Sequence, residues 1–288
     1  MFPQKLFIFL TALALTTLAC GFTVDLPTTN IKISPTVTED ILVPDPDPSA
    51  QSMDVSLSFG AGELIINSGA EALIEGTASY NVEDMKPKVE VTSNSVDLST
   101  GNLEINGIPH FENTMKNTWN LKLSQRPLNL KISAGAYSGQ FELGGLALTA
   151  LRVMDGAADV KLNFAEPNQA VMESFRYETG ASSVVLTKLG NANFRSLDFQ
   201  GGAGSYELDF SGDMQADATV RVDTGLSSLI IRVPNNLNVT VHFDGALTNV
   251  DTQGSWGQSG GLYTHSGDGP SLDITIKMGA GSVTLISQ

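Results

Sequence analysis

Apolar and polar residues alternate along most of the chain, and a glycine interrupts the alternation at recurring places. Leu128, Leu130 and Ile132, for example, lead up to Gly135, after which the alternation starts again. A period of two places every second side chain on the same face of an extended strand, which is typical of a half-buried β-strand. Each unit is therefore predicted to be a strand, a tight glycine corner and a second strand.

The corner belongs to a motif of a glycine, a small residue, two spacers and a renewed apolar alternation. The seven copies begin at Gly60, Gly135, Gly156, Gly180, Gly202, Gly225 and Gly279. The four central gaps between copies are nearly equal, and they define a period of about 22 residues, which is typical of a stacked solenoid when the units are strands. The first and last gaps are much longer, and they are interpreted as roughly three and two degraded periods.

The predicted fold is all-β: a single-stranded parallel β-helix, or β-solenoid, with about 22 residues per turn. Parallel rungs joined by crossovers favour a right-handed sense. We expect each corner glycine to adopt a positive φ, which residues with a Cβ rarely adopt. The next residue is Ala in six of the seven copies, which predicts that it points into a cramped corner. The alternative is a glycine-rich β-sandwich, which explains the strands but not the regular period.

The beginning of the chain, up to Cys20, has the pattern of an export signal. One positive charge at Lys5 precedes an apolar stretch from Leu6 to Leu18, which is short for a membrane span. Cys20, the sole cysteine of the chain, follows a small residue and precedes a glycine. This resembles the bacterial lipobox, although Leu18 stands second rather than third before the cysteine. We predict an extracytoplasmic protein anchored to the bacterial membrane by a lipid on Cys20. The alternative is an ordinary secretory signal with an incidental cysteine.

The segment after the signal is polar and rich in proline, and it is predicted to be a disordered tether. Its alternating Asp-Pro run at 44–48 lacks the glycine turn and the spaced acidic ligands of a calcium loop, so it is interpreted as a solvated spacer. The predicted organisation is a signal peptide at 1–19, the tether at 20–50, an N-terminal β segment at 51–145 and continuous C-terminal solenoid repeats at 146–288.

Candidate chemistry is sparse. The formal charge of −15 repels phosphate backbones, which argues against a nucleic-acid partner. His110, His242 and His265 lie far apart and have no metal-ligand spacing. We therefore expect no cofactor, no metal and no catalysis. A solvated position at a strand end or in a loop is the interpretation for five aspartates: Asp155, Asp159, Asp209, Asp213 and Asp217.

Two stretches of sequence carry a family resemblance. LSFGAGELIINSGAEALIEGTASYN, followed by VEVTSNSVDLSTG, resembles the toast-rack domain of bacterial envelope proteins. The downstream repeats GAGSYEL and GASSVVL resemble the LiaF-like C-terminal and adhesin-type β-solenoid families. The resemblance covers roughly residues 53–288. It implies a parallel β-solenoid attached to the bacterial envelope, with a role in adhesion or envelope-stress sensing and no catalytic residue.

The expected function is that of a non-catalytic binding or adhesin-like module for an unknown protein or glycan. The alternative is a structural protein that self-associates through the solenoid ends, because the chain ends directly after the strand pattern 283–288 and an uncapped rung offers unpaired backbone groups. A carbohydrate-active enzyme is a third reading, although Trp119 and Trp256 belong to no repeated aromatic ladder. Binding is expected where the repeat breaks, at 105–125 and 245–270.

Overall fold

The computed structural model describes residues 28–101, 108–111 and 115–288, and the chain forms two compact units. The smaller unit contains two short parallel strands, β1 (Thr28–Ile31) and β7 (Ile108–Phe111). The larger unit is built from Ile33–Leu103 and Asn113–Gln288. The described residues are all-β, as predicted, and their only helices are the 3-10 turns η1 (Glu83–Met85) and η2 (Leu189–Ala192). No helix among them is long and apolar enough to cross a membrane.

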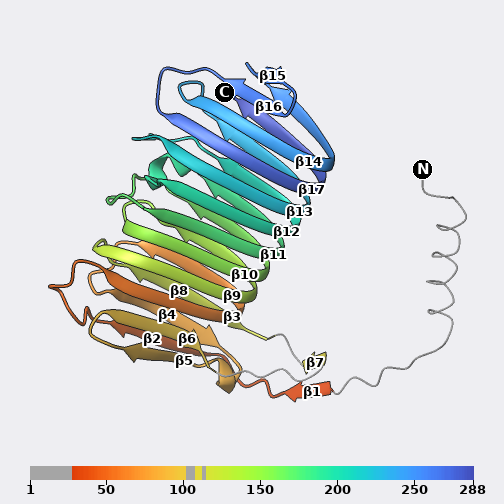
Figure 1. Ribbon diagram of the computed structural model, residues 1–288. Helices are drawn as coiled ribbons and strands as arrows, with labels where there is room; N and C mark the ends of the chain where they lie inside the picture. Colours follow the sequence, from red (N-terminus) through yellow and green to blue (C-terminus); the bar gives the residue numbers. More distant parts are fainter. Residues whose placement is uncertain (1–27, 102–107, 112–114) are drawn as a thin grey trace, which may run out of the picture. The chain divides into compact units, whose positions relative to one another are not determined.

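Eight long strands form a parallel ladder in the larger unit (Figure 1). Its central steps follow the repeat, since Leu151 pairs with Leu130 of the copy before it and with Phe175 of the copy after it. The next steps pair Phe175 with Leu197 and Leu197 with Val220. In spatial order the strands are β3 (Met53–Ser68), β9 (Pro127–Glu142), β10 (Ala147–Asn163), β11 (Ser174–Thr187), β12 (Ser196–Asp209), β13 (Ala218–Val233), β17 (Ser271–Ser287) and β14 (Asn238–Gln253).

The first outer gap in the repeat is not a set of degraded periods. Ala61 of β3 pairs directly with Ala136 of β9, so the whole stretch from Gly60 to Gly135 makes one step of the ladder. Five short strands complete the sheet on the other side of β3: two of them pair with β3 in parallel, and the rest add antiparallel pairs, so the sheet is mixed rather than uniformly parallel. These strands are β2 (Val37–Val43), β4 (Ile74–Tyr80) and β8 (Asn117–Leu123) beside one half of β3, and β5 (Pro87–Val91) and β6 (Ser95–Thr100) beside the other.

The last gap does contain one further ladder strand, β14, in agreement with two periods, but the spatial order of the strands differs from their order in the chain. The C-terminal strand β17 lies between β13 and β14, so both of its edges are paired. The prediction that the C-terminal strand leaves an open rung is therefore wrong. The ladder ends instead at β14, whose first half pairs with the antiparallel hairpin of β15 (Gly257–Ser259) and β16 (Leu262–His265).

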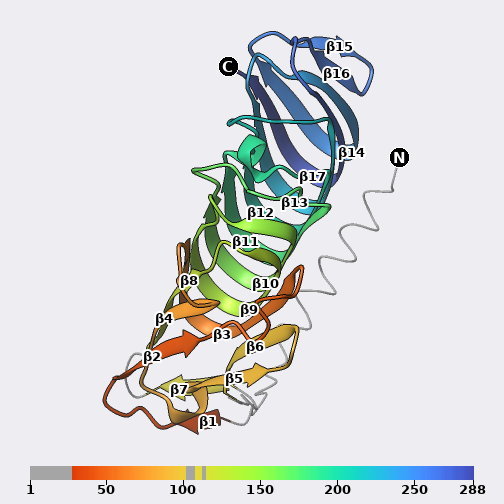
Figure 2. The same ribbon diagram turned by 90° about the vertical axis from the view of Figure 1, so that its left-hand side faces the viewer.

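The long strands are bent into a first and a second arm (Figure 2), and in seven of the eight a corner glycine of the motif lies within the strand. In β9 the buried residues include Leu128, Leu130 and Ile132 on the first arm, and Tyr137 and Phe141 on the second. Ile132 and Tyr137 are an odd number of positions apart, so a straight strand would point them to opposite faces. The bend turns both arms toward one interior, which the connections between strands close with further buried residues, such as Leu143, Phe164, Leu189 and Phe210.

The corner glycines are required for close approach rather than for a positive φ. None of the seven has a positive φ, so the expectation that backbone conformation requires glycine at the corners is wrong. A Cβ on Gly180 would instead lie 2.4 Å from the carbonyl oxygen of Gly156 on the neighbouring strand. The same contact recurs down the ladder. The residue after the glycine was expected to point inward, but it points out of the corner, and Leu226 at this position is 63 % exposed.

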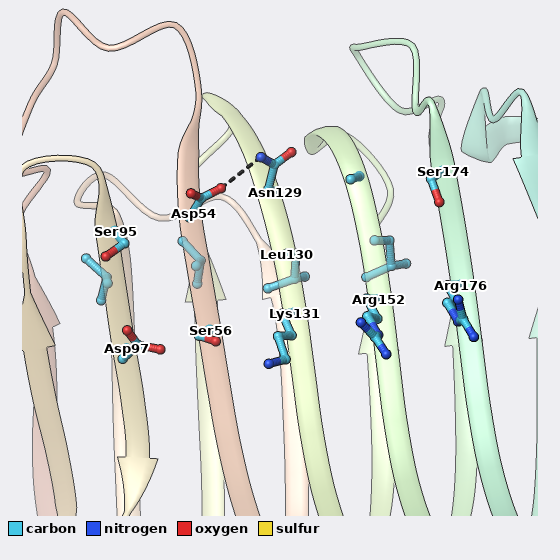
Figure 3. Close-up of a pocket in the computed structure, with 14 residues that line it drawn as sticks. Asp54, Ser56, Ser95, Asp97, Asn129, Leu130, Lys131, Arg152, Ser174 and Arg176 are labelled. Carbon is cyan, nitrogen blue, oxygen red and sulfur yellow. Dashed lines mark hydrogen bonds between the residues drawn. The ribbon is translucent and has the colours of Figure 1, made fainter.

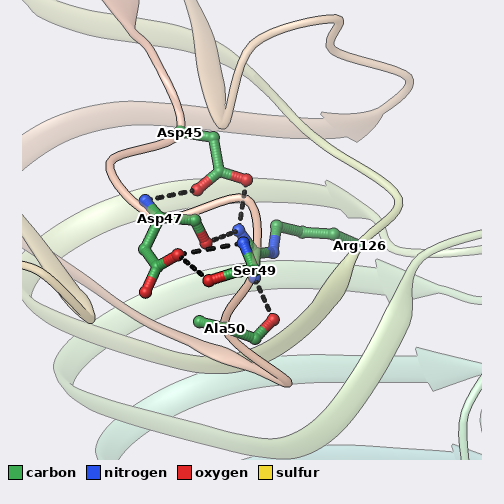
Figure 4. A network of polar contacts seen from close by, with 5 residues as sticks. All are labelled: Asp45, Asp47, Ser49, Ala50 and Arg126. Atoms are coloured by element: carbon green, nitrogen blue, oxygen red, sulfur yellow. Dashed lines mark hydrogen bonds and ion pairs between the residues drawn. The ribbon is translucent and has the colours of Figure 1, made fainter.

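Part of the predicted tether is folded. Ile41 and Val43 of β2 are buried in the core, so residues 37–43 belong to the sheet. The Asp-Pro run that follows is tied down by Arg126, which forms an ion pair with Asp45 (Figure 4). Arg126 also donates to the carbonyl oxygens of Asp47 at 3.0 Å and Ala50 at 2.6 Å. The solvated-spacer prediction is thus corrected here, because one largely buried guanidinium satisfies several acceptors of the run.

Arg126→Ala is expected to release this loop and to lower the free energy of unfolding by about 1–3 kcal/mol, since hydrogen bonds to a charged donor are lost. Native-state hydrogen exchange should show faster exchange of the Ala50 amide, which donates to the Asp47 carbonyl. The matched control is Lys122→Ala, which removes an exposed cation of β8. Unchanged protection of the Ala50 amide in Arg126→Ala would contradict this role.

Candidate functional site

Three basic residues lie side by side on the outward face of the first arms. Lys131 of β9 pairs in register with Arg152 of β10, which pairs with Arg176 of β11. Neighbouring strands are about 4.8 Å apart, so these side chains form a short row perpendicular to the strands. Figure 3 shows them on one side of the sheet. We call Lys131, Arg152 and Arg176 the basic row.

The basic row is only partly neutralised. Like charges directly opposite each other destabilise a sheet, and here they occur twice in succession. Glu178 of β11 offsets part of the repulsion, because it accepts from Nη2 of Arg152 at 3.2 and 3.4 Å and forms an ion pair with Arg176. Lys131 forms no ion pair with any described residue. The Arg152 and Arg176 side chains stay 48 % and 40 % exposed, so all three cations can meet a ligand.

The basic row borders an open hollow of 440 Å³ that crosses β6, β3, β9, β10 and β11. The hollow exists because several of the side chains that line it are small. Ser56 lies in register between Asp97 and Lys131, and Ala150 lies beside Ser174. The hollow therefore has a floor of short side chains on rigid strands, which is an arrangement suited to an extended ligand lying across the sheet.

The far side of the hollow is acidic. Asp97 of β6 stands in the same register as the basic row, and Asp54 of β3 accepts from Nδ2 of Asn129 at 2.8 Å. The site thus has opposite charges at its two ends. Such an arrangement can orient a ligand by complementary charge.

The sequence contains a pattern that indicates the basic row, although we did not predict the row from it. The pattern is seen when the copies of the repeat are aligned. Each member lies four positions before a corner glycine, and the same position holds Asp198 and Arg221 in the next two copies. The alternation places this position outward, and the repeat places successive copies on adjacent strands. Comparing the outward positions copy by copy would therefore have found the row.

The corner glycines lie at the bend of the strands and line none of this hollow. Cys20, the predicted lipidation site, lies outside the described residues. The two expected binding segments do not meet in one site, because β8 lies near the β3 end of the ladder and β14 to β16 lie at its other end.

The three histidines are not brought together. His110 lies in β7 of the smaller unit, whereas His242 is exposed on β14. His265 is buried, and its ring nitrogens lie 2.8 and 3.2 Å from two backbone carbonyl oxygens, which gives it a structural role. In the described part of the chain, no three His, Cys, Asp or Glu side chains are grouped so as to hold a metal ion.

One of the aspartates interpreted as solvated is half-buried at the bend of the strands, beside tyrosines of the core. Asp155 accepts from the hydroxyls of Tyr177 at 2.7 Å and Tyr137 at 3.4 Å, and from Thr179. Burial, followed by the charge of Asp155, raises the pKa of Tyr137 and of Tyr206. Burial also raises the pKa of Tyr177 well above its ordinary value, with the charges of Tyr137 and Asp155 adding to it. This network belongs to the fold rather than to the outward site.

Several solved bacterial structures resemble the chain. A candidate cell adhesion protein from Clostridium sporogenes is 19 % identical, with a TM-score of 0.48, and the alignment covers 88 % of this chain and 100 % of that one. A candidate adhesin from Bacteroides fragilis is 10 % identical, with a TM-score of 0.35 and coverage of 89 % and 99 %. A candidate lipid-binding protein from Parabacteroides distasonis is 12 % identical, with a TM-score of 0.38 and coverage of 90 % and 99 %.

No curated protein is significantly similar in sequence. A family model, in contrast, matches residues 26–174, which is just over half of the chain. The matched residues include β2 to β10 and therefore most of the strands that carry the hollow. The model describes the N-terminal domain of toast_rack, DUF2154. The chain belongs to the toast-rack family.

Proposed function

We propose that this chain is a non-catalytic binding module of the bacterial cell surface, attached to the membrane by a lipid on Cys20. In this proposal it engages its ligand through the basic row and the adjoining hollow. The central strands then act as a right-handed β-solenoid, with about 22 residues per turn, that holds the row rigid.

The observation that carries the proposal is the basic row itself. Three cations stand in register on neighbouring strands of a chain whose formal charge is −15, and one carboxylate serves two of them. Side chains locked on rigid strands make more precise binding groups than side chains on loops. Repulsion within the row is a cost to the fold, and a ligand of opposite charge would relieve it.

The anchor is tested with the full chain produced in a bacterial host that is fed a labelled fatty acid. We expect label on the wild-type protein in the membrane fraction, and neither label nor membrane retention for Cys20→Ser. Equal membrane retention of the two proteins would contradict anchoring through this residue.

Surface binding is tested with bacteria that display the full chain and settle on immobilised bacterial envelope material. Ser174→Tyr places a ring in the hollow and is expected to reduce adhesion about tenfold, because it blocks access to the row. The control is Ser183→Tyr, at an exposed position on the second arm of the same strand. Equal adhesion by the two variants would contradict binding at the hollow.

Self-assembly remains the second candidate, on one observation. Among the described residues, no strand pairs with the outer edge of the second arm of β14, and Leu247 there is 77 % exposed. An open edge can pair with another chain. If assembly were the function, light scattering would show a mass that grows with concentration, and Asn249→Lys on this edge would abolish the growth. A monomer at all concentrations would exclude this candidate.

A further inference from the structure

We infer that the ligand of the basic row is a linear polyanion whose charged groups are phosphates or carboxylates. The inference rests on the proposed function and adds the chemistry of the ligand to it. It comes from the direction of the row, the chemistry of its three side chains and the charges at its two ends.

The direction of the row points to an extended ligand. Lys131, Arg152 and Arg176 occupy consecutive strands, so the row spans about 10 Å at right angles to them. A chain with several charges can lie along the row and contact all three, and the open hollow leaves space beside it.

The side chains favour oxyanions. A guanidinium presents paired N–H donors that match phosphate and carboxylate oxygens, whereas the Lys131 ammonium contributes a point charge. Glu178 already shows the mode of recognition, because its carboxylate accepts from Arg152 and forms an ion pair with Arg176. A bound oxyanion would take the place of Glu178, which makes this residue an internal competitor.

The ends of the row limit how much charge it accepts. In the same register, Asp198 of β12 follows Arg176, and Asp97 lies beyond Ser56 on the other side of Lys131. These carboxylates repel a ligand whose charges extend past the three strands. The net charge of the rest of the chain is largely screened beyond about 8 Å at physiological salt, so it does not prevent local binding.

The test is isothermal titration calorimetry on the full chain carrying Cys20→Ser, with three probes: short-chain polyphosphate, oligogalacturonate and neutral dextran. We expect the first two to bind with an affinity that falls as salt rises, and dextran not to bind. The stronger of the two anionic probes identifies the source of the oxyanion. Lys131→Gln, Arg152→Gln and Arg176→Gln are each expected to weaken binding about tenfold.

Matched controls separate the row from general charge. Lys161→Gln removes an exposed cation from the second arm of β10 and is expected to leave the affinity unchanged. Glu178→Gln is expected to strengthen binding several-fold, because it removes the competitor, whereas Asp159→Asn, at an exposed carboxylate on β10, should not. Thermal denaturation of each variant verifies that it is folded.

Three results would overturn the inference: no binding of either anionic probe, equal loss in Lys161→Gln and the row variants, or equal gain in Asp159→Asn and Glu178→Gln. If adhesion still depended on Ser174 while neither probe bound, the proposed function would stand and the polyanion would be wrong. If the probes bound through the row but displayed chains did not adhere, the proposed surface function would fail instead.

Discussion

Replacing Gly180 with alanine is expected to destabilise the fold by about 2–3 kcal/mol, measured by urea denaturation. The new Cβ would lie 2.4 Å from the carbonyl oxygen of Gly156, well inside van der Waals contact. The Cβ is held by the backbone of residue 180 and the oxygen is part of the backbone of Gly156, so neither can move without shifting paired strands. Gly135→Ala, with 2.4 Å to the carbonyl oxygen of Gly60, is expected to be equally harmful.

Gly60, the corner glycine of the first ladder strand, β3, provides a control for Gly180→Ala. A Cβ on Gly60 would meet only the side-chain hydroxyl of Thr100, at 3.4 Å. Gly60→Ala should therefore change stability by less than about 1 kcal/mol, with reduced entropy of the unfolded chain in its favour. Gly156→Ala, with 3.0 Å to the nearest carbonyl oxygen, should fall between the extremes. Equal losses at Gly60 and Gly180 would mean that corner conformation, not strand contact, demands glycine.

Asp155→Ala is expected to lower the free energy of unfolding by about 2–4 kcal/mol, because it leaves several hydroxyls without their charged acceptor. Tyr177 is fully buried and donates to this carboxylate at 2.7 Å, and Thr179 donates to its other oxygen. The measurement is again urea denaturation at neutral pH.

The matched control for Asp155 is Asp159→Ala, which removes an exposed carboxylate from the same strand. It is expected to change stability by no more than about 0.5 kcal/mol. A similar loss in both variants would show that removal of negative charge from β10, and not the hydroxyl network, causes the effect.

The tyrosines of this network also predict alkaline sensitivity. Burial first, and the nearby Asp155 second, raise the pKa of Tyr137 and Tyr206 above that of an unfolded tyrosine. Below pH of about 10, tyrosines are protonated in both states and the full stability is present. At higher pH the unfolded chain loses these protons first, so stability falls as pH rises. Tyrosinate absorbance should appear together with unfolding, and full titration of the folded protein near a pH of about 10 would contradict the prediction.

The strand–glycine–strand units of this fold were predictable because each unit has its own alternation of apolar and polar residues. Alternation around Gly135 predicts two strand arms, and the equal central gaps predict which strands become neighbours. The position of the strand that starts at Ser271 was not predictable in this way. It lies between β13 and β14 and pairs with both, although β14 precedes it in the chain, and the pattern within one strand does not record such an order.

The candidate site was less accessible for a related reason. Lys131, Arg152 and Arg176 lie in three different copies of the repeat, and each one alone is an ordinary cation on a strand. They become a row only when the strands align in register. Asp155 is a second example. Its position in the sequence predicts a solvated side chain, and only the bend of the strands brings it into contact with the hydroxyl of the buried Tyr177.

Alternation and the glycine period, which are short-range properties, were enough to determine an all-β chain of bent strands with a common inward face. Backbone pairing and side-chain packing decided the rest: the strands that flank β3 and the first half of β14, the inserted C-terminal strand, the steric reason for the corner glycines and the basic row. The physical reason is that alternation depends on the geometry of one strand. Close approach, charge clustering and edge protection depend on which strands lie side by side.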